Sequence, residues 1–181
     1  ISIQTIAPEM DTGELLHVHR IPLKGRETSA SLSELCAQLA GPMVVEVLDE
    51  IERGIAKPRP QIGEPTYCRK ITKEDGHIDW HRPSREIDAR IRAFDPWPGS
   101  FTFLRNLRLS ILEVEPFDDF DSMSNAGYMT NHSPGTIIAA VVQKGIIVKA
   151  GDGYIAIKRL QVATRKAVGF QDFSNGARDI I

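Results

Sequence analysis

Hydrophobic and polar residues alternate in several short stretches of the chain, a spacing that predicts β-strands. Residues 1–6 and 15–21 alternate in this way and predict two strands near the start. The second half of the chain has short turns at Lys144-Gly145 and at Gly151–Gly153, both typical of tight connections between strands. Around these turns, alternation or short apolar runs predict strands at 101–103, 107–111, 136–142, 146–149 and 154–160.

A first helical stripe of apolar residues runs from Leu32 to Leu39 and resumes from Val44 to Ile51. Gly41-Pro42 interrupts it, so we expect a pair of helices or one kinked helix. Residues 31–34, Ser-Leu-Ser-Glu, have the pattern of a capping box and predict the start of this helix.

A second helix is predicted after Ser84, whose hydroxyl can accept a hydrogen bond from an orphan amide of the first turn. Ile87, Ile91 and Phe94 fall on one face of this helix, and Pro96 ends it.

The two tryptophans, Trp80 and Trp97, bracket this second helix. They could stack on nucleic-acid bases, but they lie beside prolines and an apolar helix face. We therefore expect both to belong to the core.

Three prolines between Lys57 and Pro65 favour extended, semi-rigid backbone and predict a linker. We therefore expect an N-terminal unit at 1–56, a linker at 57–76 and a C-terminal domain at 77–181. Five short strands after a helix fit a small barrel of the oligonucleotide-binding type. Residues 116–133 are polar and acidic, and we expect them to form a long loop.

The 181 residues carry a net charge of −2, which argues against a strongly basic nucleic-acid binder. The charge is uneven, since residues 1–66 sum to −4 and residues 67–181 to +2. Five acidic residues of the second part lie between Glu113 and Asp121, so the remainder of that part is distinctly positive. This distribution is a modest indication of a polyanionic partner, and an ordinary solvated surface is the alternative.

Cys36 and Cys68 form neither a C-x-x-C pair nor a disulfide framework, which favours a reducing compartment. No run reaches the roughly 20 apolar residues of a membrane span, and we expect none. His17 and His19 could ligate zinc, but no convergent Cys/His set accompanies them, so we expect no metal site.

Four spaced blocks of sequence together resemble the methionyl-tRNA formyltransferase family, at the junction between its two domains. The blocks are Lys70-Ile71-Thr72-Lys73-Glu74-Asp75, Ile78-Asp79-Trp80, Ile91-Arg92-Ala93-Phe94 and Pro96-Trp97-Pro98. The resemblance implies an α/β remnant of a Rossmann-like formyltransferase domain, followed by a mainly-β, OB-like barrel that binds tRNA. It implies formyl transfer from 10-formyltetrahydrofolate to the amino group of methionyl-initiator tRNA, without a metal. The whole protein would be a monomer, away from membranes, in the cytoplasm or an organelle matrix.

The resemblance places an active-site aspartate at Asp11, within Met10-Asp11-Thr12-Gly13. Formyl transfer to an amine requires a proton to leave the ammonium group, and a carboxylate can orient a neighbouring histidine for this purpose. The family's partner motifs, Asn-x-His and Ser-Leu-Leu-Pro, do not occur in these 181 residues. We therefore expect the chain alone to be inactive. Asp-Thr-Gly also matches the aspartic protease triplet, or Asp11 could simply stabilise a turn.

The resemblance also implies that basic residues contact tRNA phosphates. A solvated helix face with acidic partners is the alternative for each of them. The predicted contacts are Arg69, Lys70, Lys73, Arg85, Arg92, Arg165 and Lys166.

Two other functions fit some of these features. A formyltransferase acting on a nucleotide-linked amino sugar would share the Trp80–Pro83 and Pro96–Gly99 patterns. A non-catalytic RNA-binding barrel would share the strands of the second half. A measurement of affinity for tRNA would distinguish the sugar-directed formyltransferase, which should not bind tRNA, from the tRNA enzyme.

Overall fold

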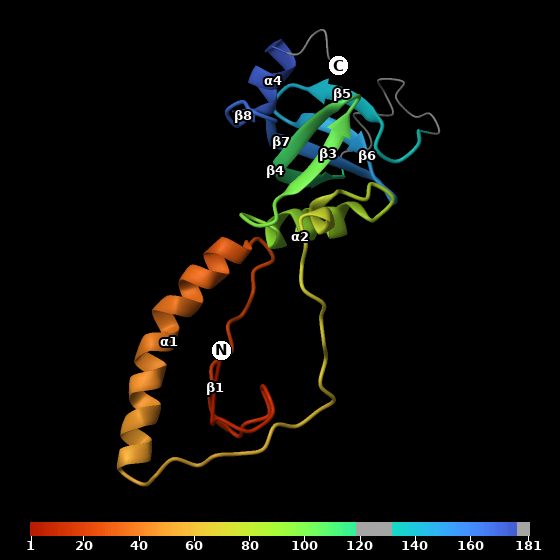
Figure 1. Ribbon diagram of the computed structural model, residues 1–181. Helices are drawn as coiled ribbons and strands as arrows, with labels where there is room; N and C mark the ends of the chain where they lie inside the picture. The colour runs from red at the N-terminus through yellow and green to blue at the C-terminus, as the bar shows by residue number, and fades with distance from the viewer. Residues whose placement is uncertain (119–131, 177–181) are drawn as a thin grey trace. The chain divides into compact units, whose positions relative to one another are not determined.

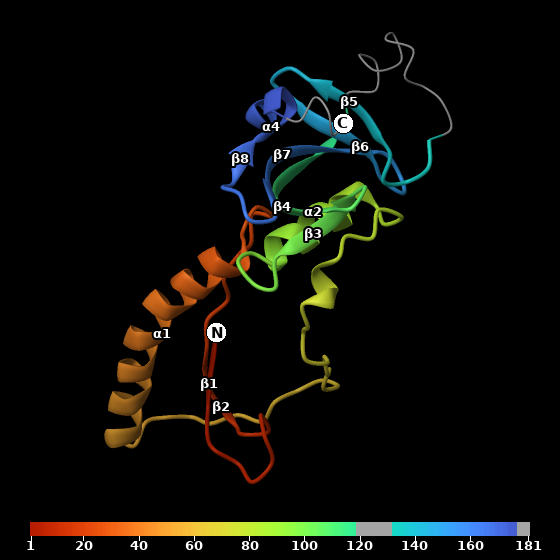
Figure 2. The same cartoon turned by 45° about the horizontal axis from the view of Figure 1, so that its top comes forward.

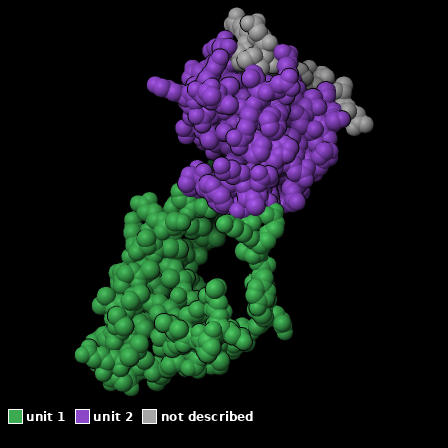
Figure 3. Space-filling view, in the orientation of Figure 1, with its two compact units in different colours: residues 1–70 green, residues 71–181 purple. Residues whose placement is uncertain are grey.

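The computed structural model describes residues 1–118 and 132–176, and its contacts divide the chain into two compact units (Figure 3). Unit 1 comprises residues 1–70 and unit 2 residues 71–181, so the division falls within the predicted linker.

Unit 1 contains a two-stranded antiparallel sheet and one long helix (Figure 1). Strand β1 (Ser2–Gln4) pairs with β2 (Leu15–Val18), which confirms both predicted strands in shortened form. Residue Arg59, from the predicted linker, exchanges two backbone hydrogen bonds with Leu15, at 2.8 and 3.0 Å. Part of the proline-rich stretch is therefore fixed to β2.

Helix α1 (Ser29–Glu52) is a single helix that continues through Pro42. Its N-cap is Thr28, which forms a capping box with Ser31. The prediction of a capping box beginning at Ser31 was wrong, because Ser31 is the third residue of the helix rather than its cap. The helix therefore begins two residues before the predicted box.

Residues of α1 such as Val45 and Leu48 are exposed within the described parts of the chain, at 67% and 59%. By length and composition alone, α1 is long and apolar enough to cross a membrane, which the expectation of no span did not anticipate. A helix that packs its apolar face against another part of a protein can have the same length and composition as a membrane span.

Unit 2 is built on a six-stranded antiparallel sheet, which Figures 1 and 2 show as strongly curved. Its strands pair in the order β3-β4-β7-β6-β5, with β8 added beside β7. The strand bounds confirm the five predicted strands and add β8. They are β3 (Ser100–Leu104), β4 (Leu107–Phe117), β5 (Ile137–Val141), β6 (Gly145–Lys149), β7 (Tyr154–Val162) and β8 (Val168–Gly169).

The described residues of unit 2 also form three short helices, namely η1 (Glu74–Gly76), α2 (Ser84–Ala93) and α4 (Phe170–Gly176). Ile87 and Ile91 of α2 are 2% and 3% exposed and join the core of β4, β6 and β7, as their spacing predicted. This core lies within the curve of the sheet, and α2 lies across one end of it (Figure 1).

Two expectations about unit 2 were wrong. Trp97 is 54% exposed rather than buried, because it lies in the turn after α2 and not on its apolar face. Strand β4 extends through Pro116 to Phe117, which is buried at 7%, so the expected loop begins later. The predicted loop residues 119–131 lie outside the described residues.

The cap of α2 comes from a distant part of the chain, and the prediction that Ser84 caps it was wrong. Pro83 occupies the N-cap position without a side-chain hydrogen bond. The Ser84 amide instead donates to the carboxylate of Asp152, at 2.7 Å, from the turn between β6 and β7. Gly151 allows this approach, because a Cβ there would lie 2.0 Å from the carbonyl oxygen of His81.

We expect Asp152→Ala to lower the free energy of unfolding by about 1 kcal/mol, because the first turn of α2 loses its side-chain acceptor. Urea unfolding followed by circular dichroism would measure the change. The Asp152→Asn variant keeps an acceptor oxygen and is expected to retain most of the stability. Equal destabilisation by both substitutions would contradict the capping role.

Candidate functional site

The Asp-Thr-Gly loop connects β1 to β2 and is closed tightly at its base. Gly13 is buried, and a Cβ at this position would lie 1.8 Å from the carbonyl oxygen of Thr5. The Thr5 amide donates to the Glu14 carbonyl at 2.9 Å, and the Glu14 amide donates to the Thr5 hydroxyl at 2.9 Å. Only glycine fits at position 13, so the packing of the loop by itself explains the glycine of the Asp-Thr-Gly motif.

Gln61 holds the same loop from the side. Its Nε2 lies 2.7 Å from the carbonyl oxygen of Asp11, 2.9 Å from that of Gly13 and 3.1 Å from Oε1 of Gln4. Asp11 has a φ of 60°, in the left-handed region that aspartate tolerates better than most residues. Its side chain is exposed, with a long contact of 3.5 Å from Gln4 Nε2 to Oδ1.

The loop thus presents one exposed carboxylate on a fixed backbone. Such a group can accept a proton, hold a cation or orient an imidazole. A lone carboxylate cannot also stabilise a tetrahedral oxyanion, because that task requires hydrogen-bond donors. Further catalytic groups would have to accompany Asp11 for acyl transfer.

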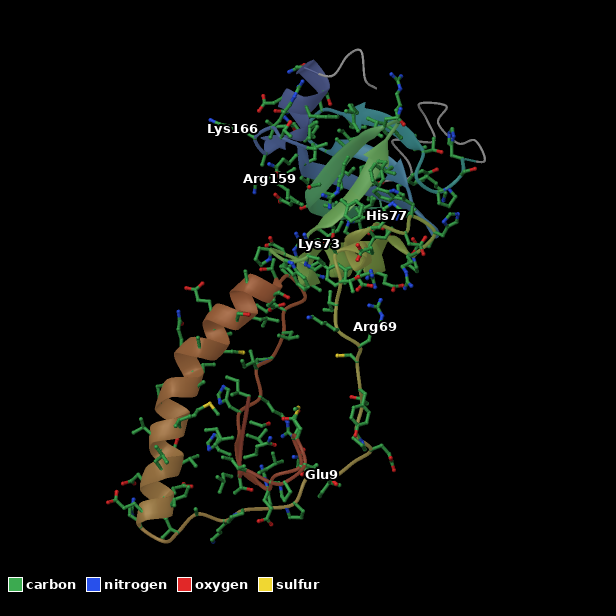
Figure 4. The ribbon with its side chains drawn as sticks, viewed as in Figure 1. Glu9, Arg69, Lys73, His77, Arg159 and Lys166 are labelled. Carbon is green, nitrogen blue, oxygen red and sulfur yellow. The ribbon has the colours of Figure 1, made fainter. Side chains whose placement is uncertain are left out.

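The basic residues predicted to contact tRNA are divided between the two units. Arg69 and Lys70 end unit 1, whereas the other five belong to unit 2. Lys73 precedes η1, Arg85 is exposed on α2, and Arg165 and Lys166 are exposed between β7 and β8. In Figure 4, Lys166 lies on the β8 side of the sheet, and Lys73 lies beside α2.

Acidic neighbours neutralise much of the charge around α2. Residues 70–92 contain six basic and five acidic side chains. Arg92 pairs with Asp88 at 3.1 Å, with the two side chains only 21% and 10% exposed. Arg82 pairs with Glu86 and, at 3.5 Å, with Asp79. The guanidinium of Arg92 is therefore committed within its own helix, which makes it the least accessible of the predicted contacts.

Two exposed carboxyl groups of this segment remain ionised well below neutral pH. The backbone amide of His81 is the main cause of the lowered pKa of Asp79. The pKa of Glu74 is lowered mainly by a hydrogen bond from its own backbone amide. Both charges therefore persist near neutral pH and partly screen Lys73 and Arg82 from an anionic partner.

Arg165 and Lys166 have a different setting, since both line a cavity of about 180 Å³. Val162, Val168 and Phe173 supply its apolar wall, and Asp172 is the acidic residue that lines it. Two cations beside an apolar hollow can bind a phosphate together with the ring or sugar attached to it.

Residues 70–178 match the family described as formyl transferase, C-terminal domain. The chain belongs to this family. Methionyl-tRNA formyltransferase of Treponema denticola is 37% identical over 182 residues, which cover 100% of this chain and 55% of that protein. The chain therefore spans about half the length of the curated relatives it matches.

Solved structures with low sequence identity share the fold. HypX from Aquifex aeolicus in complex with tetrahydrofolic acid has a TM-score of 0.66 and 17% identity, over 99% of this chain and 30% of that one. An N-formyltransferase from Helicobacter canadensis, in complex with folinic acid and dTDP-3-aminofucose, has a TM-score of 0.59 and 16% identity. It is matched over 86% of this chain and 54% of that one.

Sequence reasoning missed two features of this chain, which belongs to the formyl transferase C-terminal domain family. Gln61 was assigned only to the linker, and nothing in its local pattern indicates that it holds the Asp11 loop. The second feature is the contact of the His77 ring with the rings of Phe101 and Phe103. The Phe-x-Phe spacing on a predicted strand could have indicated one exposed aromatic face.

Proposed function

We propose that this chain is part of an enzyme that transfers a formyl group from 10-formyltetrahydrofolate to the amino group of methionyl-initiator tRNA. The observation that carries the proposal is the extent of the Treponema denticola match. It covers both units, including the Asp11 loop, and not the C-terminal family region alone.

In this reaction the amine nitrogen forms a bond to the formyl carbon and loses a proton, while the bond from that carbon to N10 of the folate breaks and N10 gains a proton. We assign Asp11 the task of orienting the group that receives the proton lost by the amine. Gln61 and Gly13 keep the loop backbone in place while the carboxylate acts.

The residues of this chain do not by themselves provide a folate site. Asp11 is the one member of the family's catalytic set that they contain, since Asn-x-His and Ser-Leu-Leu-Pro are absent from the 181 residues. We assign unit 1 to the closing part of a Rossmann-like catalytic domain and unit 2 to an OB-like barrel that binds tRNA. The complete enzyme would act as a cytoplasmic monomer.

Binding of initiator tRNA to the 181-residue chain tests the proposal. We expect Arg165→Ala combined with Lys166→Ala to weaken binding and to reduce the slope of log K against log salt by about 2, one for each lost phosphate contact. Filter binding between 50 and 200 mM salt would measure both effects. Arg53→Ala removes an exposed cation just after α1 and should leave affinity and slope unchanged.

A formyltransferase acting on a nucleotide-linked amino sugar is the second candidate. The shared fold of the Helicobacter canadensis enzyme and the Trp80–Pro83 and Pro96–Gly99 patterns favour it. Absence of tRNA affinity at low salt, with no response to salt, would select the sugar substrate over tRNA.

A further inference from the structure

Strand β3 alternates between a buried and an exposed face. Ser100 is 5% exposed, the Thr102 hydroxyl accepts a hydrogen bond from the Trp80 indole at 3.0 Å, and Leu104 packs against the core. Because successive side chains of a strand point to opposite faces, Phe101 and Phe103 lie on the outer face. Phe103 is 55% exposed, which is unusual for a large aromatic residue on a regular strand.

Three rings meet on this outer face. The ring of His77 lies 5.3 Å from that of Phe101 and 5.9 Å from that of Phe103, and the two phenylalanine rings are 5.8 Å apart and nearly perpendicular. The guanidinium carbon of Arg108 lies 4.0 Å from the centre of the Phe101 ring, a cation–π contact. Figure 4 shows His77 beside the lower part of β3.

The charge of this face favours an anionic partner. The strand register places Phe101 beside Ser110 and Ser110 beside Gln161, and it places Phe103 beside Arg108. Arg108 is thus the one charged residue among these paired positions. Glu113 belongs to the next part of β4, beyond a register shift, where the strand register places it beside Arg159.

The aromatic face continues toward the predicted tRNA contacts. The Gln161 side chain donates to the backbone carbonyl of Arg165 at 2.6 Å, and the Ala163 amide donates to the carbonyl of Arg108 at 3.1 Å. The Arg165–Lys166 loop is therefore fixed to the strand that borders the aromatic residues.

We propose that His77, Phe101, Phe103 and Arg108 form a surface on which unpaired RNA nucleotides stack. Aromatic rings bind the flat faces of bases, and nearby arginines bind phosphates, which together are the usual features of single-strand binding. Paired nucleotides do not offer these faces, so the surface distinguishes unpaired from duplex RNA. The inference deepens the proposed function and depends on it, because it names the part of the RNA that unit 2 recognises.

Binding of two fluorescent RNA probes to the 181-residue chain tests this surface, one a single-stranded octamer and the other a blunt duplex of the same sequence. We expect Phe103→Ala to weaken octamer binding about fivefold or more, the lower range for loss of one stacking contact, and to leave duplex binding unchanged. Phe103→Trp should retain octamer affinity. Arg165→Ala is the matched charge control and should weaken both probes alike.

Two results would overturn the stacking surface, namely an unchanged octamer affinity in Phe103→Ala, or an equal loss on octamer and duplex. If the unaltered chain binds initiator tRNA while Phe103→Ala has no effect on the octamer, this inference fails and the proposed function stands. If the unaltered chain binds neither tRNA nor octamer, both fail. Thermal unfolding of each variant separates lost stacking from lost folding.

Discussion

Asp11→Asn is expected to lower the rate of formyl transfer by about 100-fold or more in a protein that joins this chain to the missing catalytic motifs. Asparagine keeps the size of aspartate and tolerates a positive φ, so the loop backbone should persist. It lacks the charge that the proposed role of Asp11, which is to hold a histidine in the correct protonation state, requires. Single-turnover formylation of methionyl-tRNA would measure the loss.

Glu9→Gln provides the matched control for this experiment, because Glu9 is an exposed carboxylate of the same loop (Figure 4). The Thr12 hydroxyl donates a hydrogen bond to the backbone carbonyl of Glu9 and not to its side chain. The substitution therefore removes a charge and keeps this hydrogen bond. We expect near-normal rates. Comparable losses in both variants would assign the effect to local charge, and the 181-residue chain alone should show no turnover.

Ile155→Ala is expected to lower the free energy of unfolding of unit 2 by about 2–5 kcal/mol. Ile155 is fully buried at 0% exposure on β7, where it pairs with Val148 on one side and with Pro116 on the other. Its removal leaves a cavity in the main core that neighbouring strands cannot easily fill. Such a loss is a large part of the stability of a typical domain.

Urea unfolding with circular dichroism would measure this change as a shift of the midpoint at constant slope. Val142→Ala is the control, because Val142 is aliphatic and lies just after β5 but is 78% exposed. We expect its effect to stay within about 0.5 kcal/mol. A similar loss for both variants would mean that burial at position 155 is not the cause.

Local patterns in the sequence predicted most strands of this chain and the helices α1 and α2. Alternation located β3 and β4, and helical spacing located Ile87 and Ile91, because these signals reflect which side of an element is buried. The same patterns placed Trp97 in the core incorrectly. An apolar residue in a turn has no periodic pattern of neighbours that indicates whether its side chain points into the core or toward solvent.

Features that depend on distant contacts could not be read from the sequence. Gln61 reaches a loop about fifty positions away, and no pattern around it indicates the three oxygens it approaches. The pairing of Arg92 with Asp88 was foreseeable from their spacing of four, but its partial burial was not. The candidate tRNA contacts therefore differ in how exposed their side chains are, and this exposure depends on the packing of the folded chain.

The hydrogen bond from Ser84 to Asp152 has a consequence for the order in which unit 2 forms. Its two partners are 68 positions apart, so the chain must return from the β6–β7 hairpin before the beginning of α2 is secured. Ten residues are too few for a helix to persist alone in water. A peptide that ends after β4 would contain every residue of α2 and would still leave its first turn frayed, because the peptide lacks Asp152.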